Sequence, residues 1–533
     1  GNIDVSGLRL AGGAQPGTGV LVGNRALVTT TSGGNISLTG EMQGAGPGLV
    51  IQPLNNFSGL GIPGGRVVGS NQVVLRASNN GTADALVAGA GGQVAAGSVL
   101  NLRPGGLNLT GGPENYAATA VDRTGNPITV GGPGGTGFDL SADELATMSA
   151  PTTVIGSNAH AADINVVAAL NFGANAVTLQ NGGGGNIALQ APVTAARVGL
   201  ASAGNITQTP AAPITAGTLL ASSSGGSVLL DQAANNVSAN TLGGSAAGAF
   251  RYQDVDELRV GPVSVIGYDA AGNAPQVVSA GSMAADTVFV RTLSGDLQLG
   301  TAVSSTSGAD LVAAARFQNV GGGSLSGAPW RVWANTWVGE TRGGLAGSGP
   351  LPNLYNCAYL GLCTVSVTPG DNHFIYAQQP VATVVANNAT RPFGFPNPLL
   401  TYSITGLILG DTGGSFNGVL STTAGLGSLP GFYPINGSFS SAAGYAVNVV
   451  PGTLRVSAAI DLPRVDVLRD LPTTYLYDRN IGQAPICLAT GPLDGDRAQQ
   501  GADVLAREWS RVRSRPNLLN CVDTERRNGC ADF

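Results

Sequence analysis

The sequence predicts an all-β protein: a right-handed parallel β-helix (solenoid) followed by a small Ig-like β-sandwich and a short mixed C-terminal tail. Through roughly the first 350 residues, short runs of Val, Ile, Thr and Leu alternate with Gly, Asn and Ser clusters, which is typical of strands separated by turns. Similar segments recur about every 20 residues, as in stacked coils. Glycine supplies 82 of the 533 residues and charged residues only 11%, so most side chains face either a core or flat uncharged strand surfaces.

The repeat is clearest in three consecutive segments that begin with Gly-Asn or Gly-Ser. They start at Gly185, Gly204 and Gly226, so successive starts lie about 20 residues apart. A single coil of this length cannot bury its own apolar face, and stacking on its neighbours buries it. Gly and Asn suit the corners of such coils because both tolerate positive φ. Four apolar residues of the repeats are expected to face inward: Ile36, Ile187, Ile206 and Val228.

Changes in texture divide the chain into four parts. Five or six apolar runs separated by turns follow residue 371, as in a small β-sandwich. Residues 459–533 carry 10 of the 25 arginines and 11 of the 31 acidic residues, and a helical pattern there places Leu505, Trp509 and Val512 on one face. The predicted parts are a β-helix with a C-terminal cap (1–350), a disulfide loop or linker (351–370), the Ig-like domain (371–457) and a charged tail with one helix (458–533).

Three of the four tryptophans lie close together near the predicted end of the solenoid. On one strand, Trp333 and Trp337 would share a face and Trp330 would take the other. One interpretation is an aromatic cap over the open end of the β-helix, which a solenoid needs. The other is a platform on which a glycan stacks, because an aromatic ring offers an apolar face and a polar tip.

The residues offer little support for catalysis. His160 and His373 are the only histidines and fall in different predicted domains, so a Ser-His-Asp triad is not expected. All 25 basic residues are arginines, which excludes a phosphate loop that ends in lysine. Strand alternation would place Asp254 and Asp256 on one face, suited to Ca²⁺, to paired acid/base chemistry or to plain solvation. We therefore predict no enzyme, no catalytic residue and no cofactor, with Ca²⁺ at this pair as the one candidate ion.

Charge and hydropathy limit the partners. The net charge of −6 argues against nucleic acid, whose binding proteins show a basic stripe. No run of about 18 apolar residues is present, so no membrane-spanning helix is predicted. The sequence starts without Met or a signal-peptide pattern, and we expect a processed or truncated part of a larger secreted precursor.

Several segments resemble the repeats of filamentous-haemagglutinin-like proteins, the large exoproteins of two-partner secretion. This resemblance covers about residues 130–340, and residues 399–456 are similar to the mostly-bacterial immunoglobulin-like (MBG) repeat. Both resemblances imply a secreted protein at the bacterial outer cell surface, and the first implies an outer-membrane secretion partner. The haemagglutinin-like segments are 138–145, 153–156, 204–208, 214–219 and 233–237.

In such an exoprotein the cysteines are expected to be oxidised. Cys357 and Cys363 are predicted to close a small disulfide loop. Cys521 and Cys530 are a second candidate pair. Cys487 is then left for an intermolecular bond or a free thiol.

The sequence therefore predicts a non-catalytic adhesin or extracellular fibre protein that contacts glycans or neighbouring cell surfaces. A self-assembling filament or surface-layer subunit is one alternative. In that case copies would join through their chain ends, because open strand edges template pairing with another chain. A polysaccharide-degrading β-helix enzyme is the other alternative.

Overall fold

The computed structural model describes residues 1–10, 17–44, 46–52, 64–80, 83–89, 91–110, 117–134 and 137–458. These residues fall into two compact units: described residues within 1–389, 398–423 and 433–454 form the first, and 390–397, 424–432 and 455–458 belong to the second. The described chain is almost entirely β, as predicted. Within it, no helix is long and apolar enough to cross a membrane. The predicted tail helix, Cys487, Cys521 and Cys530 lie outside the described residues.

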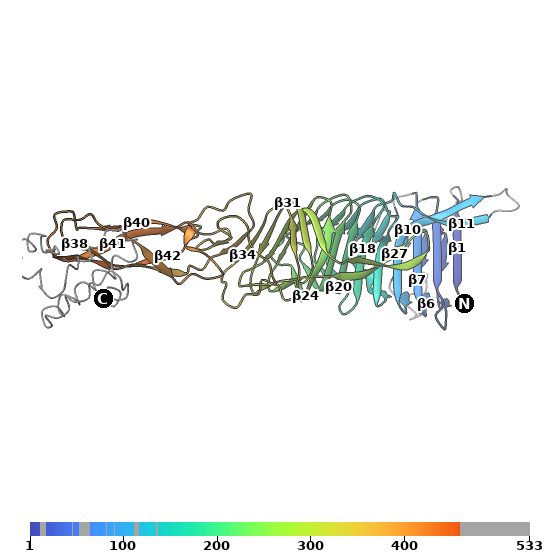
Figure 1. The fold of residues 1–533 in the computed structure, drawn as a ribbon. Helices are drawn as coiled ribbons and strands as arrows, with labels where there is room; N and C mark the ends of the chain where they lie inside the picture. Colours follow the sequence, from blue (N-terminus) through green and yellow to red (C-terminus); the bar gives the residue numbers. More distant parts are fainter. Residues whose placement is uncertain are drawn as a thin grey trace, which may run out of the picture. The chain divides into compact units, whose positions relative to one another are not determined.

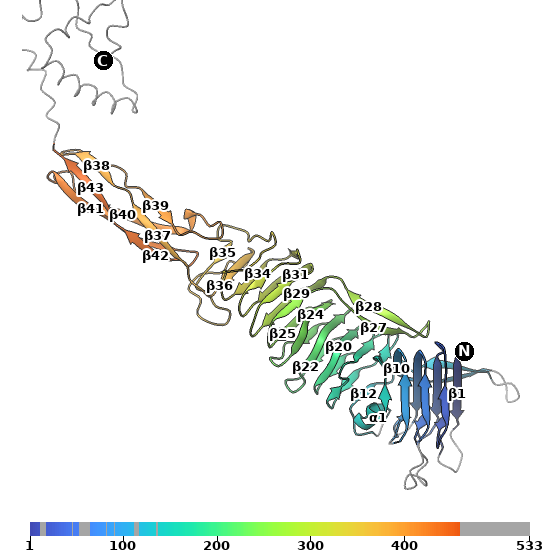
Figure 2. The same ribbon diagram turned by 90° about the horizontal axis from the view of Figure 1, so that it is seen from below.

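The first unit is built on a stack of parallel strands, seen as successive coils in Figures 1 and 2. Consecutive coils pair in register, Ile187 with Ile206, Ile206 with Val228, and Val228 with Phe250, in steps of about 20 residues. The predicted solenoid and its coil length are confirmed in this region. The paired strands are β19 (Ile187–Leu189), β21 (Ile206–Gln208), β23 (Val228–Leu230) and β25 (Ala249–Asp254).

The large sheet runs from β1 to β36, and two smaller sheets accompany its first coils. Helix α1 (Ala142–Ala146) and the 3-10 helix η2 (Gly413–Ser415) are short. The other strands of the large sheet are β1 (Ile3–Arg9), β4 (Ile36–Met42), β7 (Gln72–Asn79), β10 (Val99–Thr110), β11 (Ala117–Asp122), β12 (Ile128–Val130), β13 (Phe138–Leu140), β15 (Thr152–Ser157), β16 (Ile164–Val166), β17 (Leu170–Asn171), β18 (Ala176–Asn181), β20 (Val193–Ser202), β22 (Ile214–Ser223), β24 (Asn236–Ala246), β26 (Leu258–Val260), β29 (Met283–Thr292), β30 (Leu297–Leu299), β31 (Val303–Val312), β32 (Phe317–Gln318), β33 (Leu325–Gly327), β34 (Trp330–Ala334), β35 (Asn353–Leu354) and β36 (His373–Tyr376). The smaller sheets contain β2 (Val20–Val22), β5 (Leu49–Ile51) and β8 (Leu86–Val87), and β3 (Leu27–Thr29), β6 (Arg66–Gly69), β9 (Gln93–Ala96) and β14 (Met148–Ser149).

The first coils are longer than the repeat predicts. Ile3 pairs with Ile36, and Ile36 pairs with Val73, so each of these coils is more than half as long again as a coil in the middle of the solenoid. The added length carries the strands of the two smaller sheets, such as β2 and β3 between β1 and β4. The short period therefore describes the middle of the solenoid and not its start.

The four residues expected to face inward do so: the side chains of Ile36, Ile187, Ile206 and Val228 are fully buried. They belong to one apolar core that continues from coil to coil. Burial of an apolar side chain of this size contributes about 1.5–3 kcal/mol to the free energy of unfolding. Coil stacking therefore stabilises the solenoid, as the repeat implies.

The Gly-Asn repeats form coil corners, and contacts between coils explain them. The amide of Asn205 donates to Asn186 Oδ1 (2.9 Å), and the amide of Ser227 donates to Asn205 Oδ1 (2.8 Å). A Cβ atom on Gly204 would collide with the carbonyl of Gly185, so this corner requires glycine. Asparagine is used here for its side-chain oxygen, which satisfies an amide of the next coil.

An antiparallel hairpin interrupts the coils between β26 and β29. It consists of β27 (Val263–Asp269) and β28 (Ala274–Ala280). Val263 and Val265 pack on Leu220, outside the solenoid core. The insertion lengthens the chain between β25 and its partner β29. The two strands still pair in register, Phe250 with Val288.

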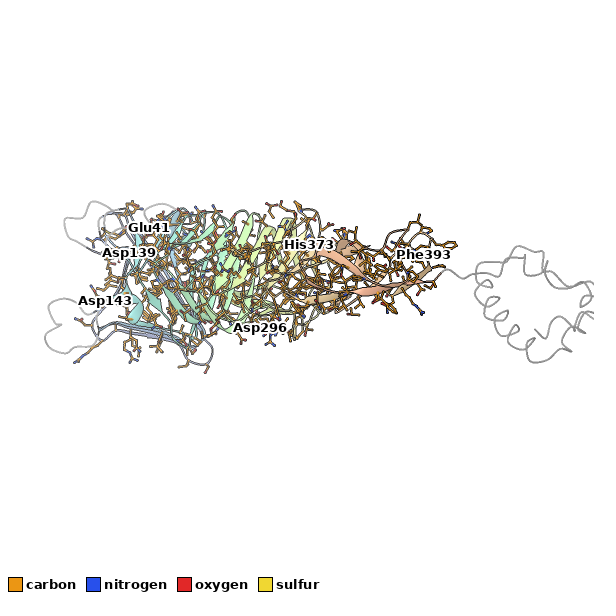
Figure 3. The ribbon with its side chains drawn as sticks, turned by 90° about the vertical axis from the view of Figure 1, so that its left-hand side faces the viewer. Glu41, Asp139, Asp143, Asp296, His373 and Phe393 are labelled. Atoms are coloured by element: carbon orange, nitrogen blue, oxygen red, sulfur yellow. A yellow bond between two sulfur atoms is a disulfide. The ribbon has the colours of Figure 1, made fainter. Side chains whose placement is uncertain are left out.

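The solenoid extends beyond residue 350, where the sequence placed its end. β36 pairs in parallel with both β34 and β35, so the expected linker lies between strands of the solenoid. His373 of β36 is labelled in Figure 3 at this end of the coils. β35 and β36 are only two and four residues long, too short to show a strand pattern in the sequence.

The Ig-like domain begins with β37 (Val381–Ala386). β37 lies between β39 (Tyr402–Thr405) and β42 (Ala446–Val450) in one sheet. β40 (Phe416–Thr422) pairs antiparallel with β41 (Gly431–Ser441). The remaining described strands are β38 (Ala389–Pro392) and β43 (Gly452–Ser457).

The described part of the second unit is held together by side-chain hydrogen bonds. Arg391 is buried, and its Nε donates to Asn397 Oδ1 (2.6 Å). Asn397 Nδ2 donates to the carbonyl of Ala424 (2.6 Å). These bonds fix segment 390–397 against segment 424–432.

Candidate binding surface on the solenoid

One outward-facing column of side chains crosses the last coils of the solenoid. In register, Arg251 of β25 pairs with Phe289 of β29, Phe289 with Asp310 of β31, and Asp310 with Arg331 of β34. These residues point outward because strands alternate and the residues beside Arg251, Phe250 and Tyr252, are fully buried. Neighbouring strands lie about 4.8 Å apart, so the column places one side chain at each such step.

A second column runs beside the first, two residues further along each strand. It contains Gln253, Arg291, Val312 and Trp333 in register, and of these Val312 is covered by its neighbours. Trp333 Nε1 donates to Asp310 Oδ1 (2.9 Å), which ties the two columns together. Arginine and aromatic residues therefore gather on a chain in which charged residues are 11% and aromatic residues 5% of the total.

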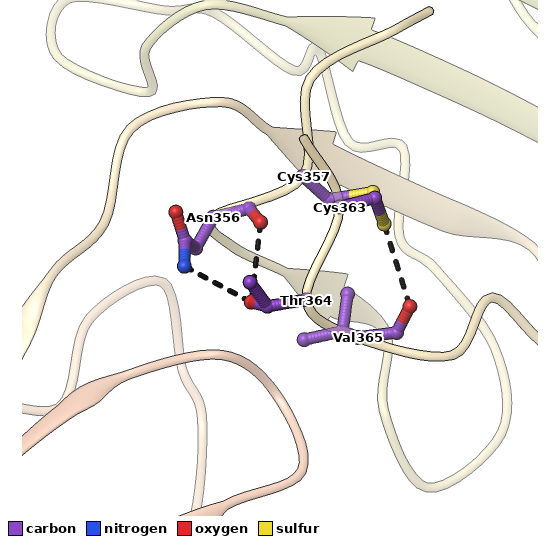
Figure 4. The surroundings of a disulfide bond; sticks show 5 residues. All are labelled: Asn356, Cys357, Cys363, Thr364 and Val365. Carbon is purple, nitrogen blue, oxygen red and sulfur yellow. Dashed lines mark hydrogen bonds between the residues drawn. A yellow bond between two sulfur atoms is a disulfide. The ribbon is translucent and has the colours of Figure 1, made fainter. Parts of the chain in front are cut away.

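The disulfide loop adds a third aromatic ring, that of Tyr359, to those of Phe289 and Trp333. Cys357 and Cys363 are bonded, with an S–S distance of 1.99 Å, and Asn356 Nδ2 donates to Thr364 Oγ1 (3.0 Å) beside them (Figure 4). Tyr359, inside this loop, packs on two rings of the columns. Its ring centroid lies 5.4 Å from that of Trp333 and 6.0 Å from that of Phe289. Burial, and next the Asp310 carboxylate, raise the pKa of the Tyr359 hydroxyl.

Two arginines lie over these rings. The guanidinium carbon of Arg251 is 4.6 Å from the Phe289 centroid, and that of Arg291 is 5.3 Å from the Tyr359 centroid. Such cation–π contacts contribute about 0.5–1 kcal/mol at exposed sites and hold the guanidinium in place. We call the set the outer ladder: Arg251, Phe289, Arg291, Asp310, Arg331, Trp333 and Tyr359.

The arginines of the outer ladder differ in their ionic partners. Arg251 Nε donates to Asp231 Oδ2 (2.8 Å). Among the described residues, neither Arg291 nor Arg331 forms a salt bridge. Arg291 reaches only Gln253 Oε1 (3.4 Å), and the buried Nε of Arg331 has no hydrogen-bond partner in the described part of the chain. The ladder therefore carries two guanidinium groups whose charge is not matched by a salt bridge.

The structure separates the three tryptophans that the sequence grouped. Trp330 points into the solenoid core, where its ring lies 5.2 Å from that of Phe374. Trp333 faces outward, but Trp337 does not share its face, because β34 ends at Ala334. Trp337 instead packs on Tyr355 (5.4 Å). The three residues thus do not form one platform; Trp330 and Trp337 pack within the molecule, and Trp333 belongs to the outer ladder.

A partly buried carboxylate joins the end of the solenoid to the Ig-like domain, and no sequence pattern pointed to it. Asp411 Oδ2 accepts hydrogen bonds from the hydroxyls of Tyr355 (2.7 Å) and Tyr445 (2.6 Å). Asn353 Nδ2 donates to its other oxygen (2.7 Å). Burial, followed by the bond to Asp411, raises the pKa of Tyr445 to about 12 and that of Tyr355 further.

Asp254 and Asp256 do not share a solvated face, because β25 ends at Asp254. Asp254 is fully buried and accepts from the Tyr252 hydroxyl (2.8 Å) and the Val237 amide (3.0 Å). Burial raises its pKa to about 6. In the described residues, no group of three or more His, Cys, Asp or Glu side chains is placed to hold a metal ion. Asp254 therefore serves as a buried acceptor at a corner of the coil, where the amide of the partly exposed Asp256 also donates to it (3.1 Å).

The two histidines are buried in different coils of the solenoid and not, as predicted, in different domains. His160 is 2% exposed, and its Nε2 has no hydrogen-bond partner among the described residues. Both ring nitrogens of His373 lie near backbone carbonyls, Nδ1 at 2.9 Å from Leu351 and Nε2 at 3.1 Å from Thr368. These contacts give His373 a role in packing the end of the solenoid.

Comparison with known proteins identifies one part of the chain. Residues 382–455 match the family model of the MBG domain (YGX type), in agreement with the resemblance of residues 399–456. This match covers the Ig-like domain from β37 to β43. No curated protein and no solved structure is significantly similar to the chain.

Proposed function

We propose that this chain is a secreted bacterial surface protein that acts in adhesion or as a structural fibre, without catalysis. The observation that carries the proposal is the outer ladder, a concentration of arginine and aromatic side chains on a solenoid whose outward positions are otherwise mostly small or uncharged. Preceding coils place Ala188, Thr207 and Leu229 at positions in register with Arg251. A solenoid presents such a surface for contact with an extended partner.

Location at the cell surface is supported by the MBG domain, because such domains occur in bacterial surface proteins. The resemblance of residues 130–340 to filamentous-haemagglutinin-like exoproteins supports export through an outer-membrane secretion partner. Glycans or neighbouring cells are the proposed contacts, and other copies of this chain are a further one.

Protease treatment of intact producing cells tests the location. The chain should be lost from intact cells while a cytoplasmic marker survives. Cells that lack the chain should then bind fewer glycan-coated beads or form fewer cell–cell contacts than cells that carry it. Survival of the chain on protease-treated intact cells, or equal adhesion with and without it, would overturn the proposal.

A further inference from the structure

We propose that the outer ladder is a binding site for carboxylated polysaccharide, a proposal that rests on the adhesive function above and names its ligand class. Arg291 and Arg331 bind carboxylates, and the rings of Phe289, Trp333 and Tyr359 contact the apolar faces of the sugars. The site lies on the outward faces of β25, β29, β31 and β34 and is completed by the disulfide loop.

The charge of the ladder selects the ligand. It contains three arginines and one carboxylate, Asp310, which accepts a bond from the Trp333 indole; Asp231 pairs with Arg251, so one positive charge is left in excess. Two guanidinium groups then remain without a salt bridge among the described residues. A planar guanidinium matches a carboxylate with two parallel hydrogen bonds. An anionic partner therefore supplies the acceptors that the ladder lacks.

The rings distinguish a sugar from a simple anion. Tyr359 packs at a tilt or edge-on against Phe289 and Trp333, with interplanar angles of 36° and 71°, so the three rings do not stack face to face. All three are partly exposed. A pyranose ring offers C–H groups on its face and hydroxyls at its rim, which suits an aromatic surface bordered by polar groups.

The repeat of the ladder favours a polymer. Apart from Tyr359 in the disulfide loop, its residues occupy the same two register positions on four stacked strands, so the columns extend for about 15 Å across them. Along this line the columns present Arg251, then the ring of Phe289, then the Asp310 carboxylate, then Arg331. Arg291 lies two residues along from Phe289 and Trp333 two residues along from Arg331, so a chain of sugars that carries a carboxylate at intervals would meet a cation and a ring on each side of Asp310. A single small anion would use only one of the two unpaired arginines.

The chain as a whole has a net charge of −6, so a polyanion is repelled from most of its surface. Binding must then be local to the ladder and sensitive to salt. This separates the proposal from general electrostatic adsorption, which a net-negative protein does not favour.

The test measures binding of the full chain to polygalacturonate by calorimetry at low salt, with fully methyl-esterified polygalacturonate as the matched uncharged ligand. We expect the acidic polymer to bind at least tenfold more tightly than the ester. The R291Q/R331Q variant should lose at least tenfold in affinity. R197Q is the matched control, because Arg197 is exposed on β20, which pairs with β18 and β22 and not with the ladder strands.

Retained affinity in folded R291Q/R331Q, equal binding of the ester, or no binding of the acidic polymer would each overturn the proposal. Thermal unfolding establishes that the variants fold, and R291Q alone serves if the double variant does not. A salt titration of the unaltered chain adds a measurement that needs no variant: affinity should fall steeply as NaCl is raised. A chain that is adhesive on cells but does not bind polygalacturonate contradicts this inference alone, whereas a chain absent from the cell surface contradicts the proposed function.

Discussion

The hydroxyl of Tyr355 donates a 2.7 Å hydrogen bond to Asp411 Oδ2 and so joins the end of the solenoid to the MBG-type domain. Tyr445 donates to the same oxygen from within that domain. The Tyr355 ring also packs 4.9 Å from the Tyr445 ring, so the junction combines a partly buried carboxylate with aromatic contacts. Loss of this carboxylate is costly because Tyr355 and Tyr445 are buried, so their hydroxyls would be left without an acceptor.

Removal of the Asp411 carboxylate should therefore destabilise the protein more than removal of one hydroxyl. We expect Y355F to lower the free energy of unfolding by about 1–2 kcal/mol and D411A by about 3 kcal/mol, since D411A leaves two hydroxyls without their acceptor. Urea unfolding followed by tryptophan fluorescence measures both. Y402F is the control, because Tyr402 is 39% exposed and should tolerate loss of its hydroxyl. Equal stability of D411A and the unaltered protein would contradict this account.

Asp84 should make the protein less stable as pH rises. Burial, and next the Glu144 carboxylate, raise the pKa of Asp84 from 3.8 to about 8. The folded state then holds a proton that the unfolded state releases, so the contribution of Asp84 to stability is present below about pH 4 and is lost as pH rises to 8. D84N should flatten the fall in unfolding temperature between pH 4 and 8. D4N, at an exposed position, should leave the slope unchanged.

His160 should have the opposite effect at lower pH. Burial lowers its pKa from 6.5 to about 4. The unfolded state takes up a proton that the folded state does not, so His160 costs stability as pH falls from 6.5 to 4 and stability is recovered as pH rises. Replacement by Asn should reduce this loss, whatever its effect at pH 7. An unchanged slope of unfolding temperature against pH would show that His160 is protonated in the folded state.

The solenoid was predictable because its repeat is local: alternation within a strand decides which side chain enters the core, and Ile206 follows that rule. The outer ladder was not predicted, because its members are spread along the chain from Arg251 to Tyr359 and the β27–β28 hairpin breaks the period. The sequence did carry a signal. The three-residue segments that begin at Arg251, Phe289, Asp310 and Arg331 each place an outward residue at their first and third positions, and they align with one another once the hairpin is left out. The prediction that Trp337 shares a face with Trp333 is wrong, because β34 ends at Ala334 and alternation does not continue to Trp337.

Inward and outward positions of one strand should differ in their contribution to stability, because alternation buries only every second side chain. I206A removes a fully buried side chain between Ile187 and Val228 and should cost about 2–5 kcal/mol. T207A, one position along and partly exposed, should change stability by about 0.5 kcal/mol or less. Thermal unfolding of the two variants compares them directly. Similar losses in both would contradict the inward orientation of Ile206.

The disulfide loop should matter more for the outer ladder than for the fold. Mass spectrometry without reduction should find Cys357 and Cys363 protected from alkylation. The double variant C357S/C363S should lose about 2 kcal/mol of stability, because the closed loop is short and constrains the unfolded chain little.

Tyr359, which the loop holds on Phe289 and Trp333, should then leave the ladder, and affinity for polygalacturonate should fall several-fold. Y359F keeps the ring and should retain affinity, whereas Y359A should match the double serine variant. If Y359A binds as tightly as the unaltered chain, the loop only covers the end of the solenoid and Tyr359 has no part in binding.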